Sequence, residues 1–127
     1  MQTLGAALTL VEPGVVEIEM PYQASFTQQH GFIHAGVVAS VLDSACGYAA
    51  FSLMPADAAV LSIEFKVNLL APAKGERLIA RGEVKRAGRT ITVCAADALM
   101  VEGERSKVVA TMLATMMCVR GREGLAG

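Results

Sequence analysis

Tryptophan is absent from this chain of 127 residues, and charged residues make up only 18% of it. Eleven basic and twelve acidic residues leave a formal net charge of −1, so no overall field would attract nucleic acid or an anionic membrane. The N-terminus has no basic region, and Glu12 and Pro13 interrupt its short apolar stretch, which argues against a signal peptide. We therefore expect one cytoplasmic domain over residues 1–127, with neither nucleic acid nor membrane as a partner.

Cysteine is also sparse, and its pattern excludes several chemistries. Cys46, Cys94 and Cys118 are an odd and scattered set, no pair has metal-ligand spacing, and no histidine follows any of them. In a reducing compartment such cysteines are most often small buried hydrophobes. We expect no metal site, no redox cofactor and no cysteine nucleophile.

Charge is almost missing from one long stretch. Asp43 is the only formally charged residue between residues 20 and 56, where small and apolar residues dominate. A carboxylate buried alone costs several kcal/mol unless it is paired or hydrogen-bonded. Asp43 is therefore the first candidate for catalysis, and the alternative is a structural acid that is hydrogen-bonded to a loop.

The hydrophobic pattern predicts an α+β fold. Residues 34–53 are apolar all round, which predicts a buried helix, while period-two alternation before and after them predicts strands. Short turns at residues 71–75, 86–89 and 102–105 indicate that successive strands pair in the antiparallel sense. We expect five or six strands wrapped around the helix, with a core over residues 15–119 and a frayed polar tail at 120–127. The strands are expected near residues 8–11, 15–20, 61–69, 78–85, 90–101 and 107–119.

Four segments, in their order and spacing, resemble a known family. They are the loop QQHGFIHAG at residues 28–36, Leu42-Asp43 in the helix, the strand at 62–65 leading to 71–73, and RAGRT at 86–90. This set resembles the hotdog-fold acyl-CoA thioesterases of the phenylacetic-acid-degradation type, within the 4-hydroxybenzoyl-CoA thioesterase superfamily. The resemblance implies hydrolysis of an acyl- or aryl-CoA thioester by a homodimer with shared active sites, which pairs into a homotetramer as a dimer of dimers.

The resemblance also implies catalytic roles. Asp43 would act as nucleophile or general base, Gln28 would bind the thioester or orient water, and Ser62 would assist the lytic water. The backbone N–H of Ala35 would polarise the thioester carbonyl. Two residues depart from the family pattern: Gln28 stands where this branch usually has Asn, and Ala35 stands where it usually has Gly.

Coenzyme A contacts are implied for residues 69–74 and 86–91 and for the loop that enters the helix. A surface role is the alternative for Arg86 and Arg89, as a loop-ordering or capping role is for His30 and His34. The residues expected to bind substrate or coenzyme A are His34, Gly36, Leu70, Pro72, Arg86, Gly88, Arg89 and Thr90.

Helix geometry bears on the assembly. Asp43 lies eight residues beyond Ala35, or about 12 Å along a helix axis, whereas reacting groups must approach to about 3–3.5 Å. One helix therefore cannot present both groups to one carbonyl, and a symmetric dimer is expected. The functional alternatives are a non-catalytic acyl-CoA-binding module and a hydratase or dehydratase that would use His34.

Overall fold

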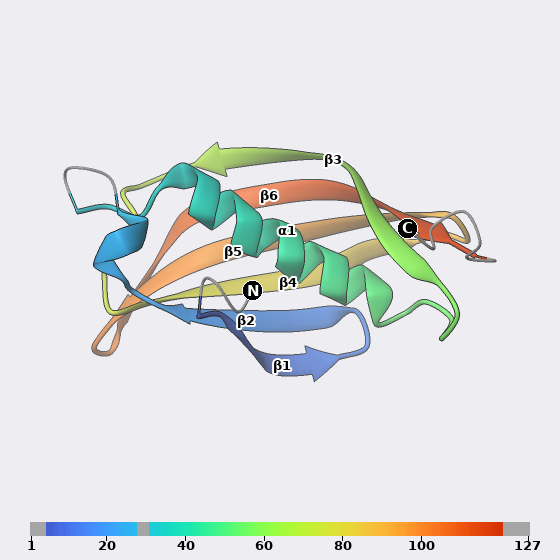
Figure 1. Cartoon of the computed structure of the whole chain (residues 1–127), viewed down its shortest axis with the longest axis horizontal. Helices are drawn as coiled ribbons and strands as arrows, with labels where there is room; N and C mark the ends of the chain where they lie inside the picture. Colours follow the sequence, from blue (N-terminus) through green and yellow to red (C-terminus); the bar gives the residue numbers. More distant parts are fainter. Residues whose placement is uncertain (1–4, 28–30, 121–127) are drawn as a thin grey trace.

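The computed structural model describes residues 5–27 and 31–120, which form one helix packed on one six-stranded antiparallel sheet (Figure 1). Within these residues no helix is long and apolar enough to cross a bilayer. The elements in chain order are β1 (Ala7–Glu12), β2 (Val15–Pro21), the 3-10 helix η2 (Ala24–Phe26), α1 (Ala35–Phe51), β3 (Ala59–Leu69), β4 (Arg77–Ala87), β5 (Ile91–Glu102) and β6 (Arg105–Val119). The predicted fold class is confirmed, and most of the predicted tail lies outside the described residues.

The order of the strands corrects one prediction. The sheet runs β1-β2-β4-β5-β6-β3, so β3 is an edge strand that pairs with β6 instead of with β4. The segment at residues 71–75 therefore belongs to a crossover from the edge strand β3 past β6 and β5 to the interior strand β4, and it is not a hairpin turn. β4, β5 and β6 do form the antiparallel meander that their short connections predicted.

The core lies between α1 and the concave face of the sheet. Val38, Val41, Leu42, Ala45 and Cys46 of α1 are buried against apolar residues of β2, β4, β5 and β6. The helix and the sheet touch most closely at Gly82 of β4, where a Cβ atom would lie 2.6 Å from the carbonyl oxygen of Ala45. A residue without a side chain is required there for the helix to sit this close to the strand.

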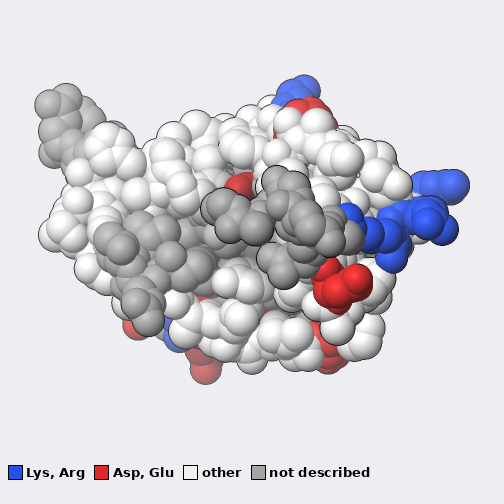
Figure 2. All heavy atoms as spheres, turned by 45° about the vertical axis from the view of Figure 1, so that its right-hand side comes forward, with Lys and Arg blue, Asp and Glu red and all other residues white. Residues whose placement is uncertain are grey.

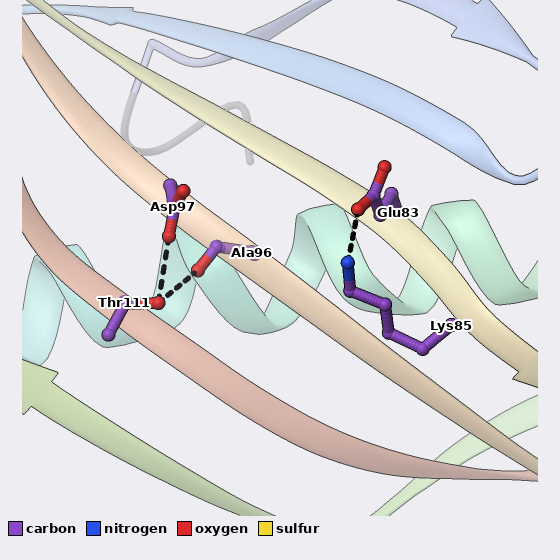
Figure 3. A network of polar contacts seen from close by, with 5 residues as sticks. All are labelled: Glu83, Lys85, Ala96, Asp97 and Thr111. Carbon is purple, nitrogen blue, oxygen red and sulfur yellow. Dashed lines mark hydrogen bonds and ion pairs between the residues drawn. The ribbon is translucent and has the colours of Figure 1, made fainter.

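The convex face of the sheet carries both polar and apolar side chains, and some of its polar side chains contact one another (Figure 3). Lys85 pairs with Glu83 on β4, and Thr111 of β6 donates to a carboxylate oxygen of Asp97 on β5 at 2.7 Å. Lys85 also lowers the pKa of the Glu83 carboxyl by a hydrogen bond and by its charge. These exposed pairs contribute little to stability. They are nevertheless exposed to solvent, and the buried side of the sheet is the side that carries α1.

The composition of α1 predicted a helix buried on all sides, but the structure leaves one side exposed. Gly36, Ser40 and Tyr48 are exposed, and Asp43 is only half-buried, so one face of α1 is open to solvent in the single chain. Cβ atoms at Gly36 and Gly47 would meet nothing within 4 Å, so no neighbouring atom of the described chain lies against these two positions. This open face of α1 carries the candidate active site.

Candidate active site

Asp43 and Ser62 meet across the gap between α1 and β3. The Ser62 hydroxyl donates a hydrogen bond of 2.8 Å to Oδ1 of Asp43, and its oxygen also lies 3.3 Å from the sulfur of Met116. Ser62 points towards the helix because its cross-strand partner is the buried Met116 of β6. None of the ion pairs among residues 5–27 and 31–120 involves Asp43, so a hydroxyl, not a cation, holds this carboxylate.

A bulge in β3 controls the direction of Ser62. Ser62 pairs with Met116 and Glu64 pairs with Thr115, so Ile63 is one extra residue in the ladder. Two residues apart on a regular strand, Ser62 and Glu64 would share a face. The bulge instead leaves Ser62 on the helix side, while Glu64 accepts a hydrogen bond from the Thr115 hydroxyl at 2.7 Å.

Asp43 and Ser62 lie in an open hollow of about 330 Å³. Its other walls come from the C-terminal half of α1 and the first part of β3. The lining residues are Asp43, Ser44, Gly47, Tyr48, Phe51, Val60 and Ser62. We call this hollow the acid pocket; it can hold a small group directly beside a carboxylate.

A second hollow, of about 510 Å³, lies at the N-terminus of α1, and we call it the helix-entry pocket. It brings together Ala35, predicted to be catalytic, with three residues predicted for substrate or coenzyme A binding: His34, Leu70 and Pro72. His34 is the N-cap residue, but its side chain makes no capping hydrogen bond to the first-turn amides. Those amides and the positive end of the helix dipole suit an oxygen with developing negative charge.

The two pockets are separate in one chain. Asp43 and Ser62 line the acid pocket only, and Ala35 lines the helix-entry pocket only. Gly36 lies on the exposed face of α1 beside Ala35 but lines neither pocket. Gln28, the remaining predicted catalytic residue, lies outside the described residues, as does His30.

The β4–β5 hairpin carries the other predicted coenzyme A residues. Gly88 closes the turn: its amide donates to the Ile91 carbonyl at 2.8 Å, and a Cβ atom would lie 2.5 Å from that oxygen. The geometry of the turn therefore explains why position 88 is a glycine. Thr90 is exposed, and its carbonyl accepts a hydrogen bond from the Cys118 amide at 2.7 Å, which ties the hairpin to the end of β6.

That tie brings in a third arginine that the sequence interpretation missed. The Arg120 guanidinium donates to the Arg89 carbonyl at 3.1 Å, and Arg86, Arg89 and Arg120 are all exposed. None of these three takes part in an ion pair among the described residues, whereas Arg77 and Arg81 on the sheet are paired with glutamates. Basic side chains gather at this end of the molecule (Figure 2). Arg120 was missed because it is 31 residues from Arg89 in the sequence.

The three cysteines are buried, as the sequence predicted. Cys46, Cys94 and Cys118 are buried free thiols. Burial, with smaller effects from Cys94 and Asp43, raises the pKa of the Cys46 thiol to about 12, and burial raises the pKa of Cys94 to about 11. These two thiols stay protonated and inert near neutral pH. The residues described contain no cluster of three or more acidic, histidine or cysteine side chains that could hold a metal ion.

Comparison with known proteins agrees with this geometry. The model of the thioesterase superfamily matches residues 30–114. The chain belongs to the thioesterase superfamily. A thioesterase family protein from Silicibacter pomeroyi is 56% identical, with a TM-score of 0.94 over 95% of this chain and 89% of that chain. The six-stranded sheet with one helix is thus the hotdog fold of this superfamily.

More distant relatives carry names of the same kind. An esterase-named protein of Halobacterium salinarum is 34% identical over 95 residues, which are 71% of this thioesterase-family chain and 62% of that protein. The chain thus spans less than two thirds of that relative. A phenylacetic acid degradation-related thioesterase structure from Ralstonia eutropha JMP134 shares the fold, with 23% identity and a TM-score of 0.81 over 91% of this chain and 86% of that one.

The thioesterase fold also identifies residues that the sequence interpretation passed over. Tyr48 and Phe51 line the acid pocket with Asp43, yet both were read only as part of an apolar helix. The available signal was the spacing of three residues between them, because residues three apart are neighbours on a helix surface. The exposed side of α1 could not be recognised from the sequence, because all sides of the helix have a similar apolar composition.

Proposed function

We propose that this protein hydrolyses acyl-CoA thioesters to a free acid and coenzyme A, with Asp43 as nucleophile or general base. The observation that carries the proposal is the hydrogen bond of 2.8 Å from Ser62 to Asp43 inside an open pocket. The hydroxyl fixes one carboxylate oxygen and leaves the other free to attack the carbonyl or to take a proton from water. On either route a C–O bond replaces the C–S bond, and the sulfur leaves as a thiolate that takes up a proton. Attack by water gives the free acid directly, whereas attack by Asp43 gives an acyl anhydride that water then hydrolyses to the free acid and the Asp43 carboxylate.

The oxyanion needs donors that the acid pocket of one chain does not contain. Ala35, at the start of α1, has an amide suited to this task but lines the other pocket. The two pockets lie at the two ends of β3: Val60 and Ser62 line one, and Leu69 lines the other. A second copy related by a twofold axis near the middle of β3 would carry its helix-entry pocket to the acid pocket of the first copy.

The edge strand supports this arrangement. β3 has 11 residues and leaves a long unpaired edge, with Ile63 at 50% and Leu69 at 57% exposure. A long apolar edge of this kind is a template for pairing with another chain. Antiparallel pairing of two β3 strands would cover that edge and complete two equivalent sites. Association of such dimers into a tetramer is part of the same proposal.

The hairpin arginines would hold the phosphates of coenzyme A. Arg86, Arg89 and Arg120 offer exposed guanidinium groups with no carboxylate competing for them among the described residues. Guanidinium groups bind phosphate by paired hydrogen bonds. The hydrogen bond to the Arg89 carbonyl fixes Arg120 near the hairpin and leaves its other N–H groups available.

Thiol release from a panel of acyl-CoAs tests the chemistry. We expect Asp43→Asn to lower kcat by at least about a hundredfold, the scale of a lost catalytic group, with little change in binding. Asp97→Asn is the matched control, because Asp97 is an exposed acid on the convex face of the sheet. Equal rates for wild type and Asp43→Asn would reject Asp43 as the catalytic group. No thiol release by the wild type, with acyl-CoA still bound, would instead identify a non-catalytic binding module.

A mixing experiment tests the shared site. Ala35→Pro removes the amide donor, and proline suits this first helical position because His34 has ψ of 139°, the extended value that precedes proline. We expect Ala35→Pro and Asp43→Asn each to be inactive alone. Refolded together, they should regain about a quarter of wild-type activity, because half of the dimers would hold one intact site of two. No recovery from a dimeric mixture would exclude the shared site.

A further inference from the structure

We infer that Gly47, Tyr48 and Phe51 of α1 form the acyl-binding wall of the acid pocket and restrict the substrate to compact acyl groups. This inference rests on the proposed hydrolysis at Asp43, because it names the part of the substrate that lies beyond the reacting carbonyl. It concerns the direction from Asp43 towards the C-terminus of α1, away from the residues considered for coenzyme A.

The pocket has a reactive end and an apolar end. Asp43 and Ser62 form the first, and Tyr48, Phe51 and Val60 form the second. Along the helix axis Tyr48 is about 7.5 Å and Phe51 about 12 Å from Asp43. A thioester whose carbonyl lies at Asp43 and whose sulfur points to the partner's helix N-terminus would therefore extend its acyl group over Gly47 towards Phe51.

Packing does not explain the glycine at position 47. A Cβ atom there would meet nothing within 4 Å, so no neighbour requires the side chain to be absent. Glycine inside a helix costs about 1 kcal/mol relative to alanine. Gly82 shows the opposite case, because its missing side chain is what allows the helix to touch the sheet. What the missing side chain at position 47 provides is open space in the floor of the acid pocket.

The two aromatic residues expose apolar surface at the same place. Tyr48 and Phe51 are each 42% exposed, although they belong to the otherwise small-residue side of α1. Residues three apart are neighbours on a helix surface, so the two rings together form a flat apolar wall. Such a wall favours a short aliphatic chain or a single ring, since aromatic faces stack in offset or edge-to-face geometries.

Phe51 sets the limit on length. It is the last residue of α1, and Val60 faces it from the beginning of β3. A long alkyl chain would have to displace this ring or leave the hollow of about 330 Å³. We therefore expect short straight-chain and single-ring acyl thioesters to be substrates, and long-chain fatty acyl thioesters to be poor ones.

Two opposite variants test the wall. Phe51→Ala removes the end wall, and we expect it to raise the kcat/KM ratio of dodecanoyl-CoA to hexanoyl-CoA at least about tenfold, the discrimination typical of a hydrophobic pocket. Gly47→Leu fills the floor and should lower kcat/KM for hexanoyl-CoA at least about tenfold more than for acetyl-CoA. Leu53→Ala is the control, because Leu53 is an equally exposed apolar residue near the helix end that does not line the pocket.

Binding of S-hexyl- and S-dodecyl-CoA thioethers, which cannot be hydrolysed, separates this inference from the proposed reaction. A protein that hydrolyses no thioester, but in which Phe51→Ala still shifts the dodecyl-to-hexyl Kd ratio about tenfold, would keep the acyl wall and lose the proposed activity. Unchanged ratios in both assays would overturn the inference. So would a Phe51→Ala variant that only weakens dimerisation, because the ring would then be an interface residue.

Discussion

The two faces of α1 follow different rules, and two glycines show the difference. On the inner face, Gly82 of β4 is in contact with the Ala45 carbonyl, and an added Cβ atom would lie 2.6 Å from its oxygen. On the outer face, Gly47 has open space around it. Packing determines the inner face, and on our proposal the ligand determines the outer face, so substitutions on the two faces should change different measured quantities.

The largest effect on folding should come from the inner face. Gly82→Ala places a methyl group against helix backbone, which cannot move aside as a side chain can. Overpacking of this kind costs about 1–3 kcal/mol, and contact with backbone belongs at the upper end. Urea denaturation should show a lower midpoint with an unchanged slope. A midpoint within error of the wild type would mean that the helix does not sit this close to β4.

Loss of the Ser62 hydroxyl should affect activity and spare the fold. Ser62→Ala removes the hydrogen bond to Asp43, and we expect kcat to fall about tenfold with KM nearly unchanged. Ser62→Thr keeps a hydroxyl on a β-branched residue that suits a strand, and it should restore most of the rate. If Ser62→Thr were as slow as Ser62→Ala, the size of the side chain and not its hydrogen bond would matter.

Alkaline pH should weaken the inner face through its thiols. Because burial raises the pKa of Cys46 to about 12 from an ordinary value of 9.0, the folded protein keeps a proton that the unfolded chain loses. The stability from this group is complete below pH 9 and is lost as the pH rises towards 12, by up to about 1.4 kcal/mol per pH unit. Denaturation at pH 8 and pH 10 should show a smaller loss for Cys46→Ala than for the wild type. An equal loss in both would assign the alkaline sensitivity to other groups.

The smallest expected effect sharpens the contrast between the two glycines. Gly47→Ala should raise the free energy of unfolding by about 0.5–1 kcal/mol, because alanine favours the helix and its methyl group meets open space. Ser40→Ala on the same exposed face is the comparison, because it raises helix propensity but also removes the hydrogen bond of 2.8 Å from the Ser40 hydroxyl to the Gly36 carbonyl. A destabilised Gly47→Ala variant would contradict the open floor of the acid pocket.

The sequence pattern predicted those parts of the fold that depend on local order. Alternation located the strands, and the change of period located α1 to within two residues at each end. It could not predict that β3 pairs with β6, because a segment of seven residues between β3 and β4 resembles a turn and the pairing is long-range. The open face of α1 could not be predicted for a related reason: an apolar composition shows that a face is hydrophobic, but it does not show whether another part of the chain covers that face.

The candidate site was predicted from resemblance more than from periodicity. The alternation of β3 gave Ser62 only as a position on the polar side of a strand, and the family resemblance alone joined it to Asp43; in the structure the Ser62 hydroxyl lies 2.8 Å from Oδ1 of Asp43. Arg120 had no motif of its own, since its place depends on the contact between the end of β6 and the β4–β5 hairpin. Contacts of this kind can be predicted only once the fold is known, because the residues that make them are far apart in the sequence.

The bulge at Ile63 has a consequence for the history of this strand. Because Ile63 is the extra residue, its deletion would close the ladder with Ser62 still opposite Met116, and the hydroxyl would keep facing α1. A regular pairing of every residue now in β3 would instead place Ile63 opposite Met116 and turn Ser62 away from the helix. Descendants of this gene can therefore lose that codon without moving the hydroxyl, but they cannot straighten the strand at its present length.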